Sequence, residues 1–225
     1  MSGAVRLGVA DREWLLPPAF AAWIPAGTPI AFEMPHPVTS CSVLFVPGFA
    51  EDVSPPLPAD TTVFAMDVLA REMVRHARRW GPDGDGYGAE AATFFRALAG
   101  VIAGLGRRPA DVWRPVTSDP ALRAAIAFTE AEHGREIVVA DAARSAGLTE
   151  RTLLRRYASE LGMTWAQSLR RIRMIAAMER LVTTRDPITS VALDVGYQSL
   201  SAFNTAFRDF AGATPSAIRS GPDAR

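Results

Sequence analysis

The sequence predicts an α+β protein in which short strands come first and a purely helical region follows. Residues 1 to about 65 contain short apolar runs separated by proline, such as WLLPP at 14–18 and SVLFVPGF at 42–49. Proline at these intervals prevents long helices, and the Val, Phe and Trp between the prolines suit strands. From residue 118 onwards, apolar residues recur at helical spacing. We therefore expect a small β region followed by an all-α region.

A change of pattern at Asp67 predicts two helices between these regions. VLAREMVRHARRW at 68–80 and AEAATFFRALAGVIAGL at 89–105 have helical spacing, and GPDGDGYG at 81–88 separates them. The pair can serve as ordinary core, or one helix can also present a face to a second copy of the chain. GRRPADVWRP at 106–115 is typical of a linker, so the first domain is expected to cover residues 1–110 and the second 118–220.

The helical region begins with clear capping signals. Ser118 or Asp119 can cap a helix whose first turn contains Pro120 and which ends near Gly134. Further helices are expected at about 138–146, 150–161, 165–183, 189–195 and 200–211.

The composition excludes several classes of protein. The 225-residue chain has no net charge, and all 24 of its basic residues are Arg. Cys41 is the single cysteine, which excludes an intramolecular disulfide and a four-cysteine zinc site. No uninterrupted apolar run reaches the roughly 18 residues that a membrane span needs, and the N-terminus does not resemble a signal peptide. We expect a cytoplasmic protein with no cofactor and no membrane partner.

The helical region contains an internal repeat. Ala143 and Gly147 recur 49 positions later as Ala192 and Gly196, and Thr149 recurs after 50 positions as Ser199. A small residue where two helices cross, a glycine at the turn and a Ser or Thr cap are typical of a helix-turn-helix unit. We therefore predict two such units, at about 137–161 and 188–211, with these residues as their structural positions.

The second helix of each unit is expected to enter a DNA major groove. In the first unit, Arg151 and Arg155 are predicted to face outward and bind guanine, because Arg satisfies both guanine acceptors. The buried stripe of this helix is expected to consist of Leu153, Leu154, Tyr157 and Leu161. In the second unit, the outward face carries Ser201, Asn204, Thr205 and Arg208 around a core of Phe203, Ala206, Phe207 and Phe210.

The helix at 165–183 is expected to space the two units. Its 19 residues measure about 28 Å, and successive major grooves on one face of DNA lie about 34 Å apart. Between Thr149 and Arg185, eight Arg face three acidic residues. Each of these arginines could equally be a solvated surface residue. The predicted phosphate or positioning contacts are Thr149, Arg156, Arg170, Arg171, Ser199, Asn204 and Arg208.

These motifs resemble the AraC/XylS family of bacterial transcription regulators. The segment ALDVGYQSLSAFNTAFRDFAGATPSAIR at 192–219 is similar to the family signature, and 148–174 is similar to its first unit and linker helix. The resemblance implies a sequence-specific regulator of promoters that binds double-stranded DNA and recruits or blocks RNA polymerase. It implies base-reading roles for Arg151 and Arg155 in the first unit, and for Leu200, Ser201 and Thr205 in the second.

Residues 14–35 resemble the later strands of a cupin-type sensor domain. This resemblance implies a sensor or dimerisation domain over 1–110 and a small-molecule effector. Ile30 stands where such sensors commonly have His, so we expect no metal there. Only about 13 residues precede Trp14, which predicts an incomplete, open sheet. An exposed sheet edge needs a cover, and this is a second argument for a homodimer. The apolar residues Trp14, Trp23, Phe32 and Phe45 are candidates for core or for an effector pocket.

Two other functions compete with DNA binding. A cupin-type metalloenzyme would need clustered His and carboxylate ligands, but His36, His76 and His133 fall in three different elements, so we expect no catalysis and no metal. A ligand-binding or protein-interaction module with a degenerate DNA-binding half is the other alternative. The salt dependence of binding separates a DNA-binding protein from an interaction module, because only a DNA binder releases many counterions.

Overall fold

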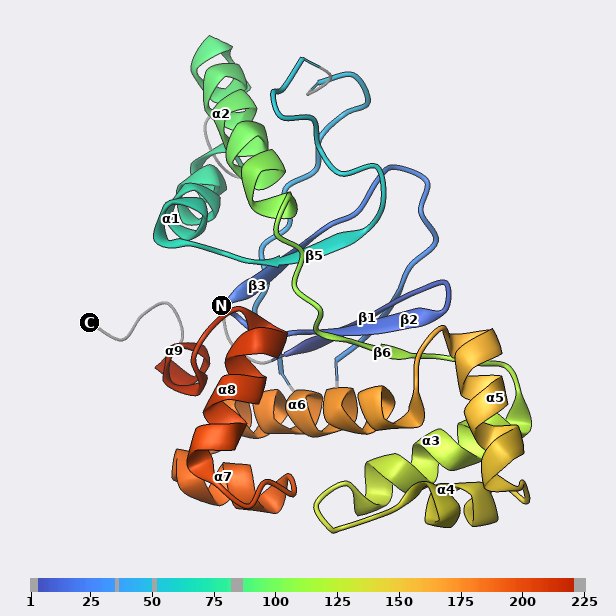
Figure 1. The fold of residues 1–225 in the computed structure, drawn as a ribbon. Helices are drawn as coiled ribbons and strands as arrows, with labels where there is room; N and C mark the ends of the chain where they lie inside the picture. Colours follow the sequence, from blue (N-terminus) through green and yellow to red (C-terminus); the bar gives the residue numbers. More distant parts are fainter. Residues whose placement is uncertain (1–3, 35–36, 50–51, 82–86, 221–225) are drawn as a thin grey trace.

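The computed structural model describes residues 4–34, 37–49, 52–81 and 87–220. It confirms an α+β fold, with a small antiparallel sheet and a helix pair preceding a helical C-terminal half (Figure 1). The sheet lies against one side of the long helix α6 (Trp165–Thr183), and the remaining C-terminal helices surround the other sides and the ends of α6.

In the part of the chain that the structure describes, the sheet is open and does not close into a barrel, in agreement with the expectation from the sequence. Four antiparallel strands have the order β4-β1-β2-β6, from β1 (Val5–Val9), β2 (Arg12–Leu16), β4 (Ala31–Glu33) and β6 (Trp113–Pro115). Strands β3 (Phe20–Trp23) and β5 (Thr62–Ala65) form a separate antiparallel pair. Strand β4 is an edge strand whose three residues are exposed.

Strand β6 corrects the expectation of a plain linker at 106–115. Trp113 pairs with Trp14, and Pro115 pairs with Arg12. Pro115 is tolerated there because β6 is an edge strand, where one missing N–H group leaves no ladder bond unmade. The chain between the predicted domains is therefore part of the N-terminal sheet.

The helix pair forms close to its expected positions. Helix α1 (Val68–Ala77) continues into a 3-10 turn at Arg78–Trp80, and α2 spans Ala89–Gly106. Most of the predicted breaker, residues 82–86, lies outside the described residues. The rings of Trp80 and Phe94 lie 4.8 Å apart and hold the two helices together. Helix α2 is long and apolar enough to cross a membrane by length and composition alone, and 22% of it is buried.

The C-terminal helices agree closely with the sequence pattern. Asp119 caps α3 (Pro120–Glu132) by accepting hydrogen bonds from the backbone N–H groups of Ala121 and Leu122. Helices α4 (Val139–Ser145) and α7 (Ile188–Asp194) differ from expectation by one residue at each end. Helices α5 (Glu150–Leu161), α6 and α8 (Leu200–Ala211) have the predicted bounds. The sequence interpretation missed α9 (Pro215–Ser220).

Two main apolar cores divide the molecule in an unexpected way. The first helix-turn-helix unit has its own core, which includes Leu122, Leu153, Tyr157 and Trp165. The second unit instead shares a core with the N-terminal sheet; its members include Leu7, Trp14, Leu15, Met174, Met178, Leu181, Phe203 and Phe207. Sheet and second unit therefore pack as one body through α6.

Candidate DNA-binding surface

The two units have the same turn geometry. Gly147 and Gly196 have φ values of 65° and 82°, a left-handed conformation that glycine adopts without steric strain. The side chains of Thr149 and Ser199 cap α5 and α8 by accepting hydrogen bonds from backbone N–H groups one turn later. Ala143 and Ala192 are 2% and 1% exposed, which agrees with close helix crossings at both turns.

The outward face of α5 carries two arginines and one leucine. Arg151 and Arg155 are exposed, and among the described residues neither forms an ion pair. Leu153 and Tyr157 are fully buried. The expectation that Leu154 is buried was wrong, because this side chain is 42% exposed. At about 100° per residue, Leu154 lies about 60° around the helix from the buried Tyr157 and about 60° from the exposed Arg151, so it borders the buried stripe and the outward face.

The outward face of α8 is less charged. Ser201, Thr205 and Arg208 are exposed, and Leu200 is 39% exposed at the start of the helix. Asn204 is half-buried. The core positions Phe203, Phe207 and Phe210 are buried, and Ala206 is partly buried. The first helix therefore offers two guanidinium groups where the second offers hydroxyl and methyl groups.

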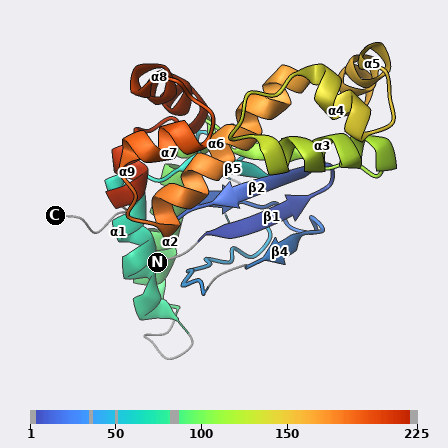
Figure 2. The ribbon, with the colours of Figure 1, turned by 90° about the horizontal axis from the view of Figure 1, so that it is seen from below.

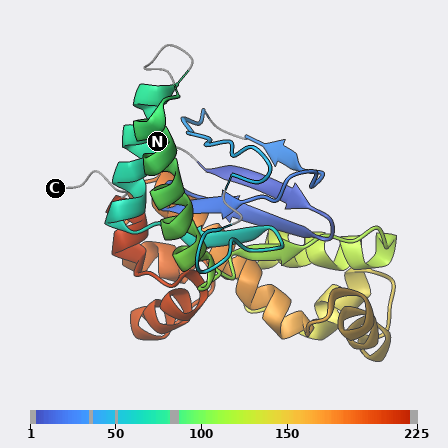
Figure 3. The same ribbon diagram turned by 90° about the horizontal axis from the view of Figure 1, so that it is seen from above.

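Both faces point away from the rest of the molecule. Helices α5 and α8 lie near opposite ends of α6 and on the same side of it, whereas the sheet lies on the other side (Figures 2 and 3). No described part of the chain covers the exposed residues of the two helices. This arrangement leaves both faces open to one long, approximately straight partner.

Three other arginines predicted to contact phosphate are bound within the protein to different degrees. Arg156 forms a 2.8 Å ion pair with Asp119, and the backbone N–H of Leu122 is the main cause of a lowered pKa for that carboxyl group. Arg171 binds Asp111, and its side chain is only 16% exposed. Arg170 lies 3.4 Å from Asp209, but both side chains remain at least half exposed, so Arg170 stays accessible.

Arg171 fastens the edge of the sheet to α6. Its guanidinium group donates hydrogen bonds to the backbone oxygens of Asp111 and Trp113, at 2.8 and 3.3 Å. The Arg171 guanidinium group also lies 4.3 Å from the centre of the Trp113 ring. The guanidinium group of Arg12 lies 4.5 Å from the same ring centre. An edge strand exposes unpaired carbonyl groups, and Arg171 satisfies two of them. This geometry argues against the predicted phosphate contact at Arg171.

Comparisons with known proteins agree with this geometry. Residues 142–221 match a helix-turn-helix domain family. Over 96% of its length the chain is 26% identical to the HTH-type transcriptional regulator NimR of Escherichia coli and covers 76% of it. It is 30% identical over 110 residues to an AraC-like transcription regulator of Streptomyces lividans, which is 49% of this chain and 36% of that protein. The C-terminal part of the chain is thus similar to the DNA-binding domains of AraC-type transcription regulators.

A solved AraC-type structure is also similar in its DNA-binding part. The transcriptional regulator from Chromobacterium violaceum is 25% identical, with a TM-score of 0.45 over 46% of this chain and 93% of that one. The chain thus covers most of NimR and of this structure, but about a third of the Streptomyces relative.

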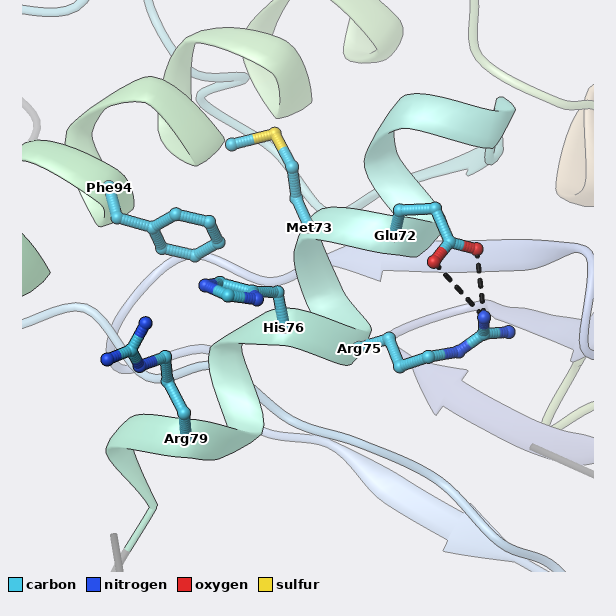
Figure 4. A pocket seen from close by; sticks show the side chains of 6 residues that line it. All are labelled: Glu72, Met73, Arg75, His76, Arg79 and Phe94. Carbon is cyan, nitrogen blue, oxygen red and sulfur yellow. Dashed lines mark hydrogen bonds and ion pairs between the residues drawn. The ribbon is translucent and has the colours of Figure 1, made fainter. Parts of the chain in front are cut away.

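Away from the outward faces of α5 and α8, two hollows are candidates for ligand sites. A cavity of about 720 Å³ lies between β1, the end of α3, α6 and α7, and the 2.9 Å ion pair of Arg6 with Glu179 lies in its wall. A shallow groove on α1 and α2 contains the Glu72–Arg75 ion pair beside Met73 and Phe94 (Figure 4). Within the described ranges, no group of His, Cys, Asp and Glu could hold a metal ion.

The four aromatic residues named as pocket candidates do not form one pocket. Trp14 is buried in the shared core, and Phe32 is 50% exposed on the edge strand β4. The rings of Trp23 and Phe45 lie 6.0 Å apart and contact each other instead. The indole N–H of Trp23 donates a 2.9 Å hydrogen bond to the Pro58 carbonyl, which fixes its orientation. Trp14 and Trp23 therefore support the N-terminal fold.

Proposed function

We propose that this regulator binds a two-part operator by placing α5 and α8 in two successive major grooves. The observation that carries the proposal is the repeated unit whose two exposed helix faces lie on one side of α6, at its two ends. The similarity of the C-terminal half to AraC-type DNA-binding domains supports the proposal that the partner is double-stranded DNA. The 19-residue α6 is a stiff spacer of suitable length for grooves about 34 Å apart.

Within the first half-site, Arg151 and Arg155 are proposed to read guanine. Their exposure without an internal ion pair leaves both guanidinium groups able to donate to O6 and N7. Leu154 borders the face of the two arginines on the side toward the buried stripe, and its 42% exposed side chain is suited to contact a thymine methyl group. The sequence interpretation missed Leu154, because a position that borders both faces can be buried or exposed.

Within the second half-site, hydroxyl groups replace the guanidinium groups. Ser201 and Thr205 are proposed to contact base edges, and the exposed Leu200 a thymine methyl group. Arg208 and Arg170 supply charge for phosphates. The capped N-termini of α5 and α8, at Thr149 and Ser199, present backbone N–H groups suited to bind phosphate. Arg156 and Arg171 are left out because their guanidinium groups are bound internally.

The experiment has two steps. Selection from random DNA duplexes identifies the operator, and titration then measures the affinity of variants. Arg151→Ala and Arg155→Ala should each weaken binding to the selected sequence by about 5- to 150-fold and relax preference at one base pair. Arg107→Ala is a matched control, because Arg107 is exposed at the end of α2, away from both helices. Unchanged affinity in the Arg151/Arg155 double variant contradicts the assignment.

Salt dependence tests DNA binding against a protein-interaction role. A protein that neutralises about 6–8 phosphates should lose several orders of magnitude in affinity between 50 and 200 mM salt. A shallow salt dependence together with no sequence preference supports the interaction module instead.

The same DNA contact can activate or repress transcription, depending on where the operator lies relative to the site of RNA polymerase. A reporter with the selected operator placed upstream of a promoter or within it measures the two effects. The sheet is proposed to carry the regulatory input from a small-molecule effector, because its core is shared with the second unit. Any ligand that stabilises the sheet therefore stabilises that unit as well.

A homodimer through α1 and α2 is the remaining part of the proposal. Helix α2 has 18 mostly apolar residues, and only 22% of it is buried within one chain. Burying this face against a second copy removes apolar surface from water. Light scattering should give the mass of a dimer, and Ala97→Arg on the exposed face should give a monomer. A monomeric wild-type protein at micromolar concentration contradicts this part alone.

A further inference from the structure

Helix α3 shares the core of the first helix-turn-helix unit, so α3 and the loop that joins it to α4 belong to that unit in the structure. The two units touch each other directly, and Arg173 lies at the contact. Arg173 projects from the middle of α6 toward the loop that joins α3 to α4 in the first unit. Its Nε donates a 2.9 Å hydrogen bond to the His133 carbonyl oxygen, and its Nη2 donates a 2.8 Å bond to the Arg135 carbonyl oxygen. Burial is the main influence on this guanidinium group and lowers the pKa of Arg173.

The turn of the second unit packs against the same guanidinium group. A Cβ atom at Gly196 would lie 2.8 Å from Nη2 of Arg173 and 2.8 Å from the His133 oxygen. A Cβ atom at Gly134 would lie 2.5 Å from the backbone oxygen of Asp194. Real Cβ atoms do not approach so closely, so both positions accommodate only glycine without movement. Residues 133–135 of the first unit therefore pack backbone against backbone on residues 194–196 of the second.

The repeat shows that this packing is specific to the second turn. Gly147 occupies the equivalent place in the first unit and has a similar positive φ of 65°, yet nothing lies within 4 Å of its would-be Cβ. The backbone conformation alone thus accounts for the glycine at position 147. At position 196, glycine is required both by the backbone conformation and by the close approach of Arg173 and His133.

We propose that Arg173 is a positioning residue that joins the two units and thereby fixes the spacing at which the protein accepts its two half-sites. This inference rests on the proposed function. Helix α6 connects the units along one axis, and each unit packs on a different end of it. The sheet adds a link, because Trp113 packs against both cores and Arg114 pairs with Glu13 of β2 and with Glu130 of α3. The Arg173 contact adds a further connection away from the α6 axis, which opposes rotation of one unit relative to the other. Because the contact is remote from the α5 and α8 faces, its effect is on geometry and not on base preference.

The DNA test compares operators of different spacing. One inserted base pair moves the second half-site by about 3.4 Å along the axis and about 35° around it. Wild-type protein should lose about tenfold or more in affinity for the inserted operator, since a whole set of contacts is displaced. Arg173→Met keeps the length of the side chain but removes its donors. Arg173→Met should bind the operator of natural spacing more weakly than wild type does. Its affinity should fall by less than about threefold when one base pair is inserted.

Two glycine variants form a matched pair. Gly196→Ala and Gly147→Ala both place a side chain at positive φ, so both should destabilise their turns and lower the urea midpoint. Only Gly196→Ala displaces the Arg173 guanidinium group. We expect relaxed spacing for Gly196→Ala, and for Gly147→Ala weaker binding with the same ratio between the two operators as wild type.

A second measurement needs no DNA and separates failure of this inference from failure of the proposed function. Amide hydrogen exchange of free protein should be at least tenfold faster at Tyr197, whose N–H bonds the Ala192 oxygen, in Arg173→Met and in Gly196→Ala. Exchange there should be unchanged in Gly147→Ala. If wild type selects no DNA sequence but exchange follows this pattern, the junction exists and the proposed function is wrong. If folded Arg173→Met and Gly196→Ala retain wild-type exchange and wild-type spacing ratios, the inference is overturned. It is also overturned if Gly147→Ala relaxes spacing equally.

Discussion

Replacing Arg171 with alanine should damage the fold and spare DNA binding. Sequence reasoning placed this residue among the phosphate contacts, whereas the structure places its guanidinium group on Asp111 and on the Trp113 ring. The substitution removes hydrogen bonds to two backbone oxygens at the edge of the sheet, and it removes the ring contact. It also detaches the sheet from α6 at that edge.

The size of the effect follows from these contacts. A hydrogen bond from a charged donor contributes about 1.5–3 kcal/mol, and a cation–π contact contributes about 0.5–1 kcal/mol at an accessible site. The side chain of Asp111 is 55% exposed, so its ion pair adds little after solvent screening. Water can also solvate one of the released carbonyl groups. We therefore expect Arg171→Ala to lower the free energy of unfolding by about 2–4 kcal/mol.

Urea unfolding and the salt slope of DNA affinity provide the assay. Arg171→Ala should shift the urea midpoint and leave the salt slope unchanged. Arg208→Ala is the matched opposite: it should leave the midpoint unchanged and reduce the slope by about 0.9, the share of one phosphate. A reduced slope with a normal midpoint in Arg171→Ala would refute the structural role argued for this residue.

Two further predictions concern the cores. Ala192→Leu should overpack the helix crossing of the second unit and lower stability by about 1–3 kcal/mol in urea unfolding, while Leu193→Ala, a change at a 59% exposed neighbour, should stay within about 0.5 kcal/mol; equal effects would contradict the crossing. Burial raises the pKa of Tyr157 to about 12, from about 10 in the unfolded chain, so the folded state keeps its proton where the unfolded chain loses it. Stability should therefore fall by about 2 kcal/mol as the pH rises from 10 to 12, and Tyr157→Phe should remove that part of the fall; an identical pH profile for both proteins would argue against a buried phenol.

Much of the helical half could be predicted because its signals are local. Gly147 and Gly196 mark turns through their backbone conformation, and Asp119 with Pro120 marks a helix start. Such signals depend on neighbouring residues only. The 49-residue repeat then placed each unit, and the outward direction of Arg151 and Arg155 followed from helical spacing.

The errors arose where distant segments meet. Nothing near Trp113 signals a strand, because β6 exists only through pairing with β2, almost 100 residues earlier in the chain. Arg171 and Arg173 look like surface charges in the sequence, and their partners at Asp111 and His133 are far from them along the chain. Leu154 is a different case, since its position between the buried stripe and the outward face leaves its exposure undecided by helical spacing. The shared core of sheet and second unit could not be predicted from any single segment.

The unlike outward faces of α5 and α8 give the bound protein a direction. If α5 and α8 read bases as proposed, Arg151 and Arg155 on one helix and Ser201 and Thr205 on the other select different bases, so the two half-sites bound by one chain differ in sequence. Turning such an operator end for end would turn the protein with it, and the N-terminal sheet would then lie over the opposite flank of the DNA. One chain of this architecture can therefore distinguish upstream from downstream.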